Sequence, residues 1–268
     1  DPEMSRGLGD VYKRQILNTA SNVQFGEGGA GTFSDGKLNT LVKDKFGRNR
    51  FVLETFVKFG APEEILWESK PHIGTDILIE VVERMREEII RLGGEFLFHS
   101  QVTDILPKEN CLIVNGCHRI ETDAAVFAVG HSARDTFKML DSKDIMMEPK
   151  SFAVGLRIMH PQEFINENAY GKCEYKLPTA DYKVTYKSVS TGKERGVYSF
   201  CMCPGGYVVN ASSEENMLAV NGMSYSGRDS ANANSAMIVT VTPDDFGNGV
   251  LDGVEFQRTV SYTHLTLP

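Results

Sequence analysis

The sequence predicts an α/β fold that is followed by a mainly β region. Residues 76–92 have the spacing of an amphipathic helix, and residues 124–128 (AAVFA) have the uniformly apolar character of a strand buried on both faces. After residue 147, strand-like runs alternate with polar loops and few helical stripes occur. This change of pattern divides the chain into an α/β unit, residues 16–147, and a β-rich region, residues 148–241.

Glycine is concentrated near the beginning of the α/β unit. Residues 21–35 read SNVQFGEGGAGTFSD, and this density predicts a loop whose backbone adopts positive φ or closely approaches a ligand. Residues 47–59 space their apolar side chains as one helical face. Residues 61–64 combine a proline with two acids, as at the start of a further helix.

The helix at residues 76–92 is the strongest prediction in the chain. Thr75 is its expected N-cap, and Gly93-Gly94 its expected C-cap. An Asn115-Gly116 turn signal then indicates a small β-meander before the buried strand. The strand-like runs of this meander are residues 96–100, 102–106, 111–114 and 118–120.

The β-rich region is expected to shape a substrate pocket or cap. Its strand-like runs are residues 152–159, 182–186, 197–202 and 237–241. Residues 242–259 are expected to begin a return segment toward the α/β unit.

Residues at both ends of the chain have the sequence of a translated DNA adapter. Residues 5–15 (SRGLGDVYKRQ) and 260–268 (VSYTHLTLP) read back as the adapter of transposase-made sequencing libraries. We therefore expect residues 1–15 and 260–268 to be adapter-encoded and exclude them from fold reasoning. The remainder is expected to be an internal fragment that is inactive alone.

Composition narrows the class of protein. The net charge of -8 argues against a nucleic-acid partner, and the absence of a run of about 18 apolar residues argues against a membrane span. The five cysteines show neither a CxxC pair nor zinc spacing, so we expect reduced thiols, a cytoplasmic location and no metal site.

The order of elements carries a resemblance. A helix, Gly-Gly, a strand, Val102, a meander and then TDAAVFAVG resemble flavoproteins of the glutathione-reductase-like FAD superfamily. The amino-acid sequences of particular segments are similar to those of the uncharacterised bacterial FAD-dependent, or NAD(FAD)-utilizing, dehydrogenases. Those segments are NVQFGEGGAGTFSDGKLNT, KPHIGTD, FAVGHSARDTF, SFAVGLRIMHPQ and MCPGGYVVNASSEENMLAVNGMSYSGRDSANANSA.

The resemblance implies an FAD/NAD(P)-binding Rossmann-like domain, truncated at its N-terminus, and an FAD-dependent oxidoreductase of unassigned substrate. NAD(P) is a candidate electron donor. The initial GxGxxG strand-turn-helix of such domains is absent, because GEGGAG at residues 26–31 lacks a preceding apolar strand and a following amphipathic helix. We interpret GEGGAG as the later glycine loop that approaches the flavin.

Cofactor contacts follow from this resemblance. The glycine loop contributes Gly26, Gly28, Gly29 and Gly31, and Val102 would contact adenine through its backbone. The turn after the buried strand contributes Ala128, Gly130, His131 and Ser132, because ligands meet the carboxyl ends of strands in open α/β sheets.

Two residues are candidates for catalytic roles. Lys37 could place a positive charge near flavin N1, and the alternative is a solvated pair with Asp35. His72 could donate a proton beside the flavin, and the alternative is a structural histidine that approaches the following helix.

Other residues leave a choice open. Arg134 and Arg228 occur in similar loops, HSARD and YSGRD, and either clamp a small anionic substrate or pair with neighbouring aspartates. Cys201 and Cys203 suggest a redox thiol pair, although CxC spacing favours ordinary strand cysteines. A non-catalytic nucleotide- or anion-binding module on the same scaffold is the alternative to an oxidoreductase.

Overall fold

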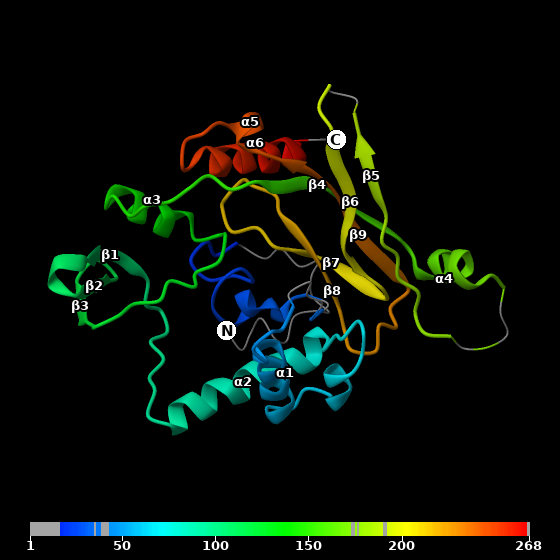
Figure 1. Cartoon of the computed structure of the whole chain (residues 1–268), viewed down its shortest axis with the longest axis horizontal. Helices are drawn as coiled ribbons and strands as arrows, with labels where there is room; N and C mark the ends of the chain where they lie inside the picture. Colours follow the sequence, from blue (N-terminus) through cyan, green and yellow to red (C-terminus); the bar gives the residue numbers. More distant parts are fainter. Residues whose placement is uncertain are drawn as a thin grey trace.

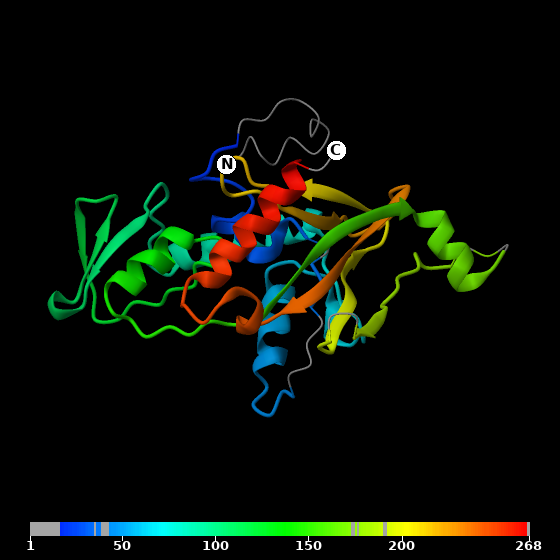
Figure 2. The same cartoon turned by 90° about the horizontal axis from the view of Figure 1, so that it is seen from above.

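A computed structural model describes residues 17–34, 36–38, 43–172, 175, 177–189 and 192–266 of the chain, without the side chains of residues 28, 30 and 263–266. A helical layer lies at the bottom of Figure 1 and a four-stranded sheet at its right, while a small three-stranded meander projects at the left. The view from above in Figure 2 separates the meander and α4 at opposite ends of the molecule.

The helical layer forms from segments that the sequence predicted as helices. It contains α1 (Arg48–Lys58), the 3₁₀ turn η3 (Glu63–Leu66) and α2 (Thr75–Arg91). The prediction of helices at residues 47–59 and 76–92 is confirmed. Their apolar faces close a core of buried side chains, which are Ala61, Ile65, Ile73, Leu78 and Val81.

The two ends of α2 differ from each other in how well they were predicted. Thr75 is not the N-cap: Gly74, with φ 88°, precedes the helix, and the Thr75 hydroxyl donates to the Ser34 carbonyl at 2.6 Å. The prediction was wrong because a tertiary acceptor takes this hydroxyl. At the other end Gly93 has φ 92° and the Gly94 N–H donates to the Ile89 carbonyl at 2.8 Å, so the glycine cap is confirmed.

The predicted meander forms from β1 (Val102–Leu106), β2 (Cys111–Val114) and β3 (His118–Glu121), with η4 (Pro107–Glu109) between the first two strands. The strands pair antiparallel in that order. Asn115 and Gly116 have φ values of 51° and 75°, as the Asn-Gly turn signal predicted. The predicted strand at residues 96–100 is wrong, because this segment is irregular and exposed.

The predicted buried strand at residues 124–128 is also wrong for this chain. The segment pairs with no strand of the described residues, and its apolar side chains face solvent: Val126 is 92% exposed and Phe127 36%. A strand that is apolar on both faces needs neighbouring strands and covering layers. The described part of the chain supplies none for this segment.

The β-rich region is confirmed. An antiparallel sheet has the order β4-β9-β6-β5, and a two-stranded hairpin, β7-β8, packs against it. The strands are β4 (Phe152–Pro161), β5 (Thr185–Ser188), β6 (Arg195–Cys203), β7 (Gly206–Asn210), β8 (Val220–Ser224) and β9 (Asn232–Val241). Every strand pair in the described ranges is antiparallel, so this mixed α/β structure does not show the Rossmann-like sheet that the resemblance implies.

Helices cover the ends of this sheet. α4 (Gln162–Tyr170) packs on β4 and β9, and α5 (Pro243–Phe246) is followed by α6 (Asp252–Thr266), whose aromatic Phe256 meets Phe152 of β4. α3 (Arg134–Ser142) lies between the meander and the sheet (Figure 1). α6 includes residues 260–266, and the structure does not test their adapter origin. None of the helices in the described ranges has the length and apolarity that crossing a bilayer requires.

Candidate functional site

The glycine-rich segment folds as a turn and not as an open loop. Gly28–Thr32 form a five-residue π-helical turn, with positive φ at Gly26 (62°) and Gly31 (86°). A Cβ on Gly29 would lie 2.7 Å from the Gln24 carbonyl oxygen, so only glycine fits there. The glycine pattern is therefore required by backbone conformation and close packing.

The glutamate within the turn is neutralised by α2. Both carboxylate oxygens of Glu27 lie 2.7 Å from Nη1 of Arg86. The Thr32 hydroxyl donates to the Glu27 carbonyl at 2.6 Å and closes the turn. The pairing with Arg86 offsets the negative charge that Glu27 would otherwise present to an anion at this turn.

Lys37 and His72 are brought together as the two partners of an isolated antiparallel bridge. On one side the Ile73 N–H donates to the Gly36 carbonyl at 3.1 Å, and on the other the Leu38 N–H donates to the Pro71 carbonyl at 2.9 Å. Residues opposite each other in such a bridge direct their side chains to the same face. The sequence named both residues but gave no indication that they pair.

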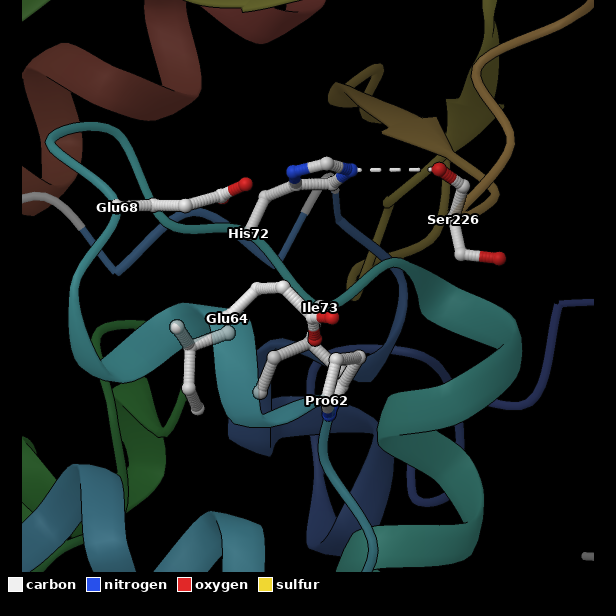
Figure 3. Close-up of a pocket in the computed structure, with 7 residues that line it drawn as sticks. Pro62, Glu64, Glu68, His72, Ile73 and Ser226 are labelled. Carbon is white, nitrogen blue, oxygen red and sulfur yellow. Dashed lines mark hydrogen bonds between the residues drawn. The ribbon is translucent and has the colours of Figure 1, made fainter.

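A loop of the β-rich region holds the His72 ring. Nε2 of His72 lies 3.3 Å from the carbonyl oxygen of Ser226 (Figure 3). Because a carbonyl only accepts, this contact requires the proton on Nε2 and leaves Nδ1 of the neutral ring as an acceptor. Ser226 is fixed in turn by Asp76, which accepts from its N–H at 2.8 Å and from its hydroxyl at 2.6 Å.

Described residues line an open pocket of 190 Å³ beside His72. Figure 3 shows Glu68 on the opposite side of the imidazole from Ser226, with Pro62, Glu64 and Ile73 beneath the ring. A cofactor pocket typically measures about 300–1,000 Å³. This pocket is therefore large enough for part of a flavin or a small substrate only.

The ammonium of Lys37 reaches β6. Lys37 Nζ donates to the Met202 carbonyl, between Cys201 and Cys203. The register of β6 against β9 shifts between Phe200 and Cys203, which marks a β-bulge, and Cys201 adopts φ 47° there. Bulges of this kind are common next to functional sites because they redirect side chains.

The bulge creates a charged environment around two thiols. The sulfurs of Cys201 and Cys203 are 3.9 Å apart, and Nη1 of Arg157 donates to the Cys201 carbonyl at 3.2 Å. The hydrogen bond with the Cys203 thiol lowers the pKa of Cys201 to about 6, against the opposing effect of burial. The charges of Arg157 and Lys37 contribute to this lowering.

The segment after the predicted buried strand meets the glycine-rich segment at one point. The Ser132 hydroxyl, on a buried residue, donates to Oε1 of Gln24 at 3.2 Å. Gly130 has φ 71°, and nothing lies within 4 Å of the position that a Cβ would take. Partial burial of the imidazole lowers the pKa of His131, and the charge of Arg134 lowers it as well. The residue as a whole is exposed.

Arg134 takes part in a carboxylate network. Glu214 lies 2.8 Å from Nη1 of Arg134 and 2.6 Å from Nη2 of Arg258. The hydrogen bond from Arg258 and the charge of Arg134 lower the pKa of Glu214. Nε of Arg134 is buried and has no partner among the described residues. Arg134 therefore retains one unsatisfied donor.

Arg228 contacts other elements. It has φ 48°, and its carbonyl accepts from the Thr179 hydroxyl at 3.1 Å. A Cβ on Gly205 would lie 1.8 Å from this carbonyl oxygen, so the loop rests directly on the β6-β7 turn. The backbone contacts of Arg228 are with Thr179 and Tyr225, whereas the Arg134 guanidinium contacts Glu214.

The structure thus assembles some of the predicted residues and separates others. Lys37 and His72 meet, their side chains contact β6 and the residue 225–227 loop, and Ser132 reaches the glycine-rich segment. Val102 begins the projecting meander and Ala128 lies in the exposed segment, and no described contact links either to the glycine turn. Asp35, the predicted neighbour of Lys37, and Cys173 lie outside the described residues.

Gly26 and Gly130 combine positive φ with open space where a Cβ would lie, so a ligand can approach the backbone there. Exposed turn glycines such as Gly47 and Gly116 have the same two features, so these features alone do not indicate a flavin. Lys37 carries a positive charge, which its Nζ directs to the Met202 carbonyl. Among the described residues no cluster of three His, Cys, Asp or Glu side chains could hold a metal ion.

Comparison with known proteins adds a family for the β-rich region. Residues 151–266 match the family described as FAD-dependent protein, C-terminal domain-like. An uncharacterized protein of Clostridium beijerinckii is 56% identical over 253 residues, which cover 92% of this chain and 46% of the relative. The chain therefore spans about half the length of the relative that it matches. The family match supports FAD association, and the domain limits at residues 147 and 241 stay predictions.

Proposed function

We propose that the chain is part of an FAD-dependent oxidoreductase, in which it supplies one wall of the flavin site and the substrate-side β region. The observation that carries the proposal is the contact of the Lys37–His72 pair with the domain that matches an FAD-dependent family. Two candidate functional side chains from one half of the chain are held by that domain at β6 and at Ser226. This arrangement favours a shared site.

The proposal includes a longer protein, of about the relative's length, that contains this chain. Its further residues would complete a Rossmann-like FAD domain. The exposed segment at residues 124–128 supports it, because its apolar side chains have the pattern of a strand that is covered on both faces. The relative is about twice as long as this chain and has the length to supply those neighbours. In this arrangement Gly130, His131 and Ser132 follow the carboxyl end of the strand, where a ligand is expected.

FAD, when bound, would take a hydride from a substrate that is oxidised and pass the electron pair to an acceptor; in the opposite direction NAD(P)H would be the electron donor. Lys37 provides positive charge that stabilises negative charge on a neighbouring ring. With its proton on Nε2 directed to Ser226, His72 presents Nδ1 as a proton acceptor to a substrate in the adjacent pocket, which is the reverse of the donor role expected from the sequence. Asp76 maintains this geometry through Ser226.

The substrate is proposed to be a small molecule, with a preference for an anion. The buried, unpartnered Nε of Arg134 supports this preference, since a guanidinium donor satisfies carboxylate or phosphate oxygens well. Arg228 remains a second candidate contact from the β-rich side.

The visible absorption spectrum of the longer protein tests the proposal. A purified protein with flavin bands that bleach on addition of a reductant supports an oxidoreductase. A colourless protein that does not take up added FAD contradicts it. Bound flavin that resists NAD(P)H, thiols and dithionite would instead favour a non-catalytic nucleotide-binding module.

A further inference from the structure

We propose that Cys201 and Cys203 form a redox-active thiol pair that reduces disulfide substrates by thiol–disulfide exchange. The inference does not rest on flavin binding, because a disulfide substrate is itself the oxidant. It concerns a site that the CxC spacing alone did not favour.

The bulge in β6 brings the two thiols close together. The bulge in β6 and the positive φ of Cys201 set the two sulfurs 3.9 Å apart, with the Cys203 thiol also directed to the Cys201 carbonyl at 3.3 Å. A disulfide requires about 2.05 Å between sulfurs. Rotation of the two side chains at the bulge can close such a gap, and a non-glycine residue at positive φ is strained enough to need a reason.

Two cationic side chains lie beside the CxC segment. Nucleophilic attack needs a thiolate, and nearby cations favour this form. Arg157 and Lys37 approach the bulge from β4 and from the Lys37–His72 bridge, and each donates to a backbone carbonyl of the CxC segment. The lowered pKa of Cys201, about 6, agrees with this arrangement. Thiolate at neutral pH is the expected state of Cys201.

Two buried donors beside the CxC segment have no partner among the described residues. Asn234, the register partner of Cys203, is fully buried, and its Oδ1 accepts from Arg157 at 2.6 Å. Because arginine only donates, this bond fixes the amide orientation and leaves Nδ2 without a partner, as is Nε of Arg157. Two buried donors next to the thiols indicate a missing acceptor. A polar group of a bound substrate would satisfy them.

Close packing shows that the cluster is a built site. A Cβ on Gly222 of β8 would lie 2.3 Å from Nη1 of Arg157, 2.3 Å from Oδ1 of Asn234 and 2.8 Å from the sulfur of Cys203. Glycine at this position therefore leaves the space in which the three side chains meet. The cluster joins β4, β6, β8 and β9.

Unequal exposure of the two thiols assigns their order of reaction. Cys201 is half-buried and Cys203 is fully buried, so a substrate reaches Cys201 first. The Cys201 thiolate attacks one sulfur of the substrate disulfide, forms a mixed disulfide and releases one thiolate. Cys203 then loses its proton and attacks the Cys201 sulfur, which releases the second thiolate. Two cysteine thiols are oxidised to one disulfide, and one substrate disulfide is reduced to two thiols.

Equilibration of the purified 268-residue chain in glutathione redox buffers tests the inference, with peptide mass mapping of trapped thiols. We expect a disulfide between Cys201 and Cys203 that forms with oxidised glutathione and is reversed by dithiothreitol. Cys201→Ser should abolish reaction at residue 203, and Cys203→Ser should accumulate glutathione on Cys201. Cys117→Ser, at an exposed cysteine of the meander, is the matched control and should change neither result.

Alkylation kinetics provide a second readout that needs no cysteine variant. The rate at Cys201 should rise with pH through a midpoint near 6 and be flat well above it. Lys37→Met should shift the midpoint upward. A folded wild-type chain that forms no 201–203 disulfide, or whose Cys201 rate still rises at alkaline pH, would overturn the proposal. Circular dichroism establishes that the chain is folded in each case.

Discussion

Lys37 and His72 form the two halves of an isolated antiparallel bridge, and both side chains contact the domain that matches the FAD-dependent family. Lys37 reaches a carbonyl of β6, whereas His72 reaches the carbonyl of Ser226 beyond β8. One short backbone pairing therefore couples two candidate functional groups to two different elements.

Replacement of His72 by glutamine should slow flavin reduction in the longer protein by roughly 10²–10⁴-fold, because a positioned proton acceptor is lost. The amide can still donate to Ser226, so binding should change less than the rate. Stopped-flow measurement of flavin bleaching gives the rate constant. His118→Gln, on the exposed strand β3, is the control, and equal rates in the two variants would contradict a role for His72.

Replacement of Lys37 by methionine should lower the midpoint potential of bound flavin. The ammonium favours the reduced, negatively charged flavin, and its removal takes away that preference. A spectroelectrochemical titration measures the shift. Lys187→Met removes an exposed charge on β5, and a shift of the same size there would argue for a general charge effect.

Replacement of Gly74 by alanine should destabilise the junction before α2. Gly74 has φ 88°, and a Cβ would lie 2.4 Å from the Ser226 N–H nitrogen. The unfavourable backbone conformation alone costs about 1–3 kcal/mol in the free energy of unfolding. Urea denaturation measures the loss. Gly196→Ala adds a Cβ that makes only ordinary contacts, and it should leave this free energy nearly unchanged in comparison.

Asp245 should make the stability of the β-rich region depend on pH. Hydrogen bonds from Arg195 and then from the Thr242 N–H hold the pKa of Asp245 well below its usual value. Because the folded-state pKa is depressed, this stabilisation is complete above the unfolded pKa of about 4 and is lost as pH falls toward the folded pKa.

The comparison of Asp245→Asn with the wild type checks this sign. The difference in Tm should be constant at neutral pH and should shrink below about pH 4. Asp244→Asn, which removes an exposed ion pair with Lys193, should have little effect at any pH. A difference that grows on acidification would mean that Asp245 acts in some other way.

Replacement of Val126 by aspartate should distinguish the chain from the longer protein. Val126 is 92% exposed here, so the change should cost about 0.5 kcal/mol or less in the 268-residue chain. In the longer protein, burial between neighbouring strands would leave the new carboxylate without water and prevent stable folding. Similar unfolding curves of wild type and variant in the longer protein would reject the proposed Rossmann-like sheet.

Local patterns accounted for the elements whose stability is local. The apolar stripe of α2 and the Asn115-Gly116 turn were both predictable, because each needs only neighbouring residues. The segment at residues 124–128 was not, since an apolar run forms a strand only where other strands pair with it, and none of the described residues pairs with this one. β7 and β8 were missed because Gly206 begins the first strand and Gly222 interrupts the second.

The candidate site was predictable in its residue types and less so in its assembly. His72 and Lys37 stood out as ionisable groups beside glycine or proline, but their pairing arises from tertiary contacts of the segments that carry them. The proximity of the Cys201 and Cys203 sulfurs could not be predicted, because a bulge cannot be recognised from CxC spacing. Thr75 was predicted to accept as an N-cap but donates instead, for the same reason: the Ser34 carbonyl lies near only after folding.

The contact between Gly205 and the Arg228 carbonyl has a consequence for how the protein can change over generations. Any side chain at position 205 would displace the loop that also carries Ser226, and Ser226 is bonded to Asp76 and His72. Substitutions at the β6-β7 turn are therefore tied to compensating substitutions around residues 72–76. We therefore expect these two segments, which are distant in sequence, to covary among homologues.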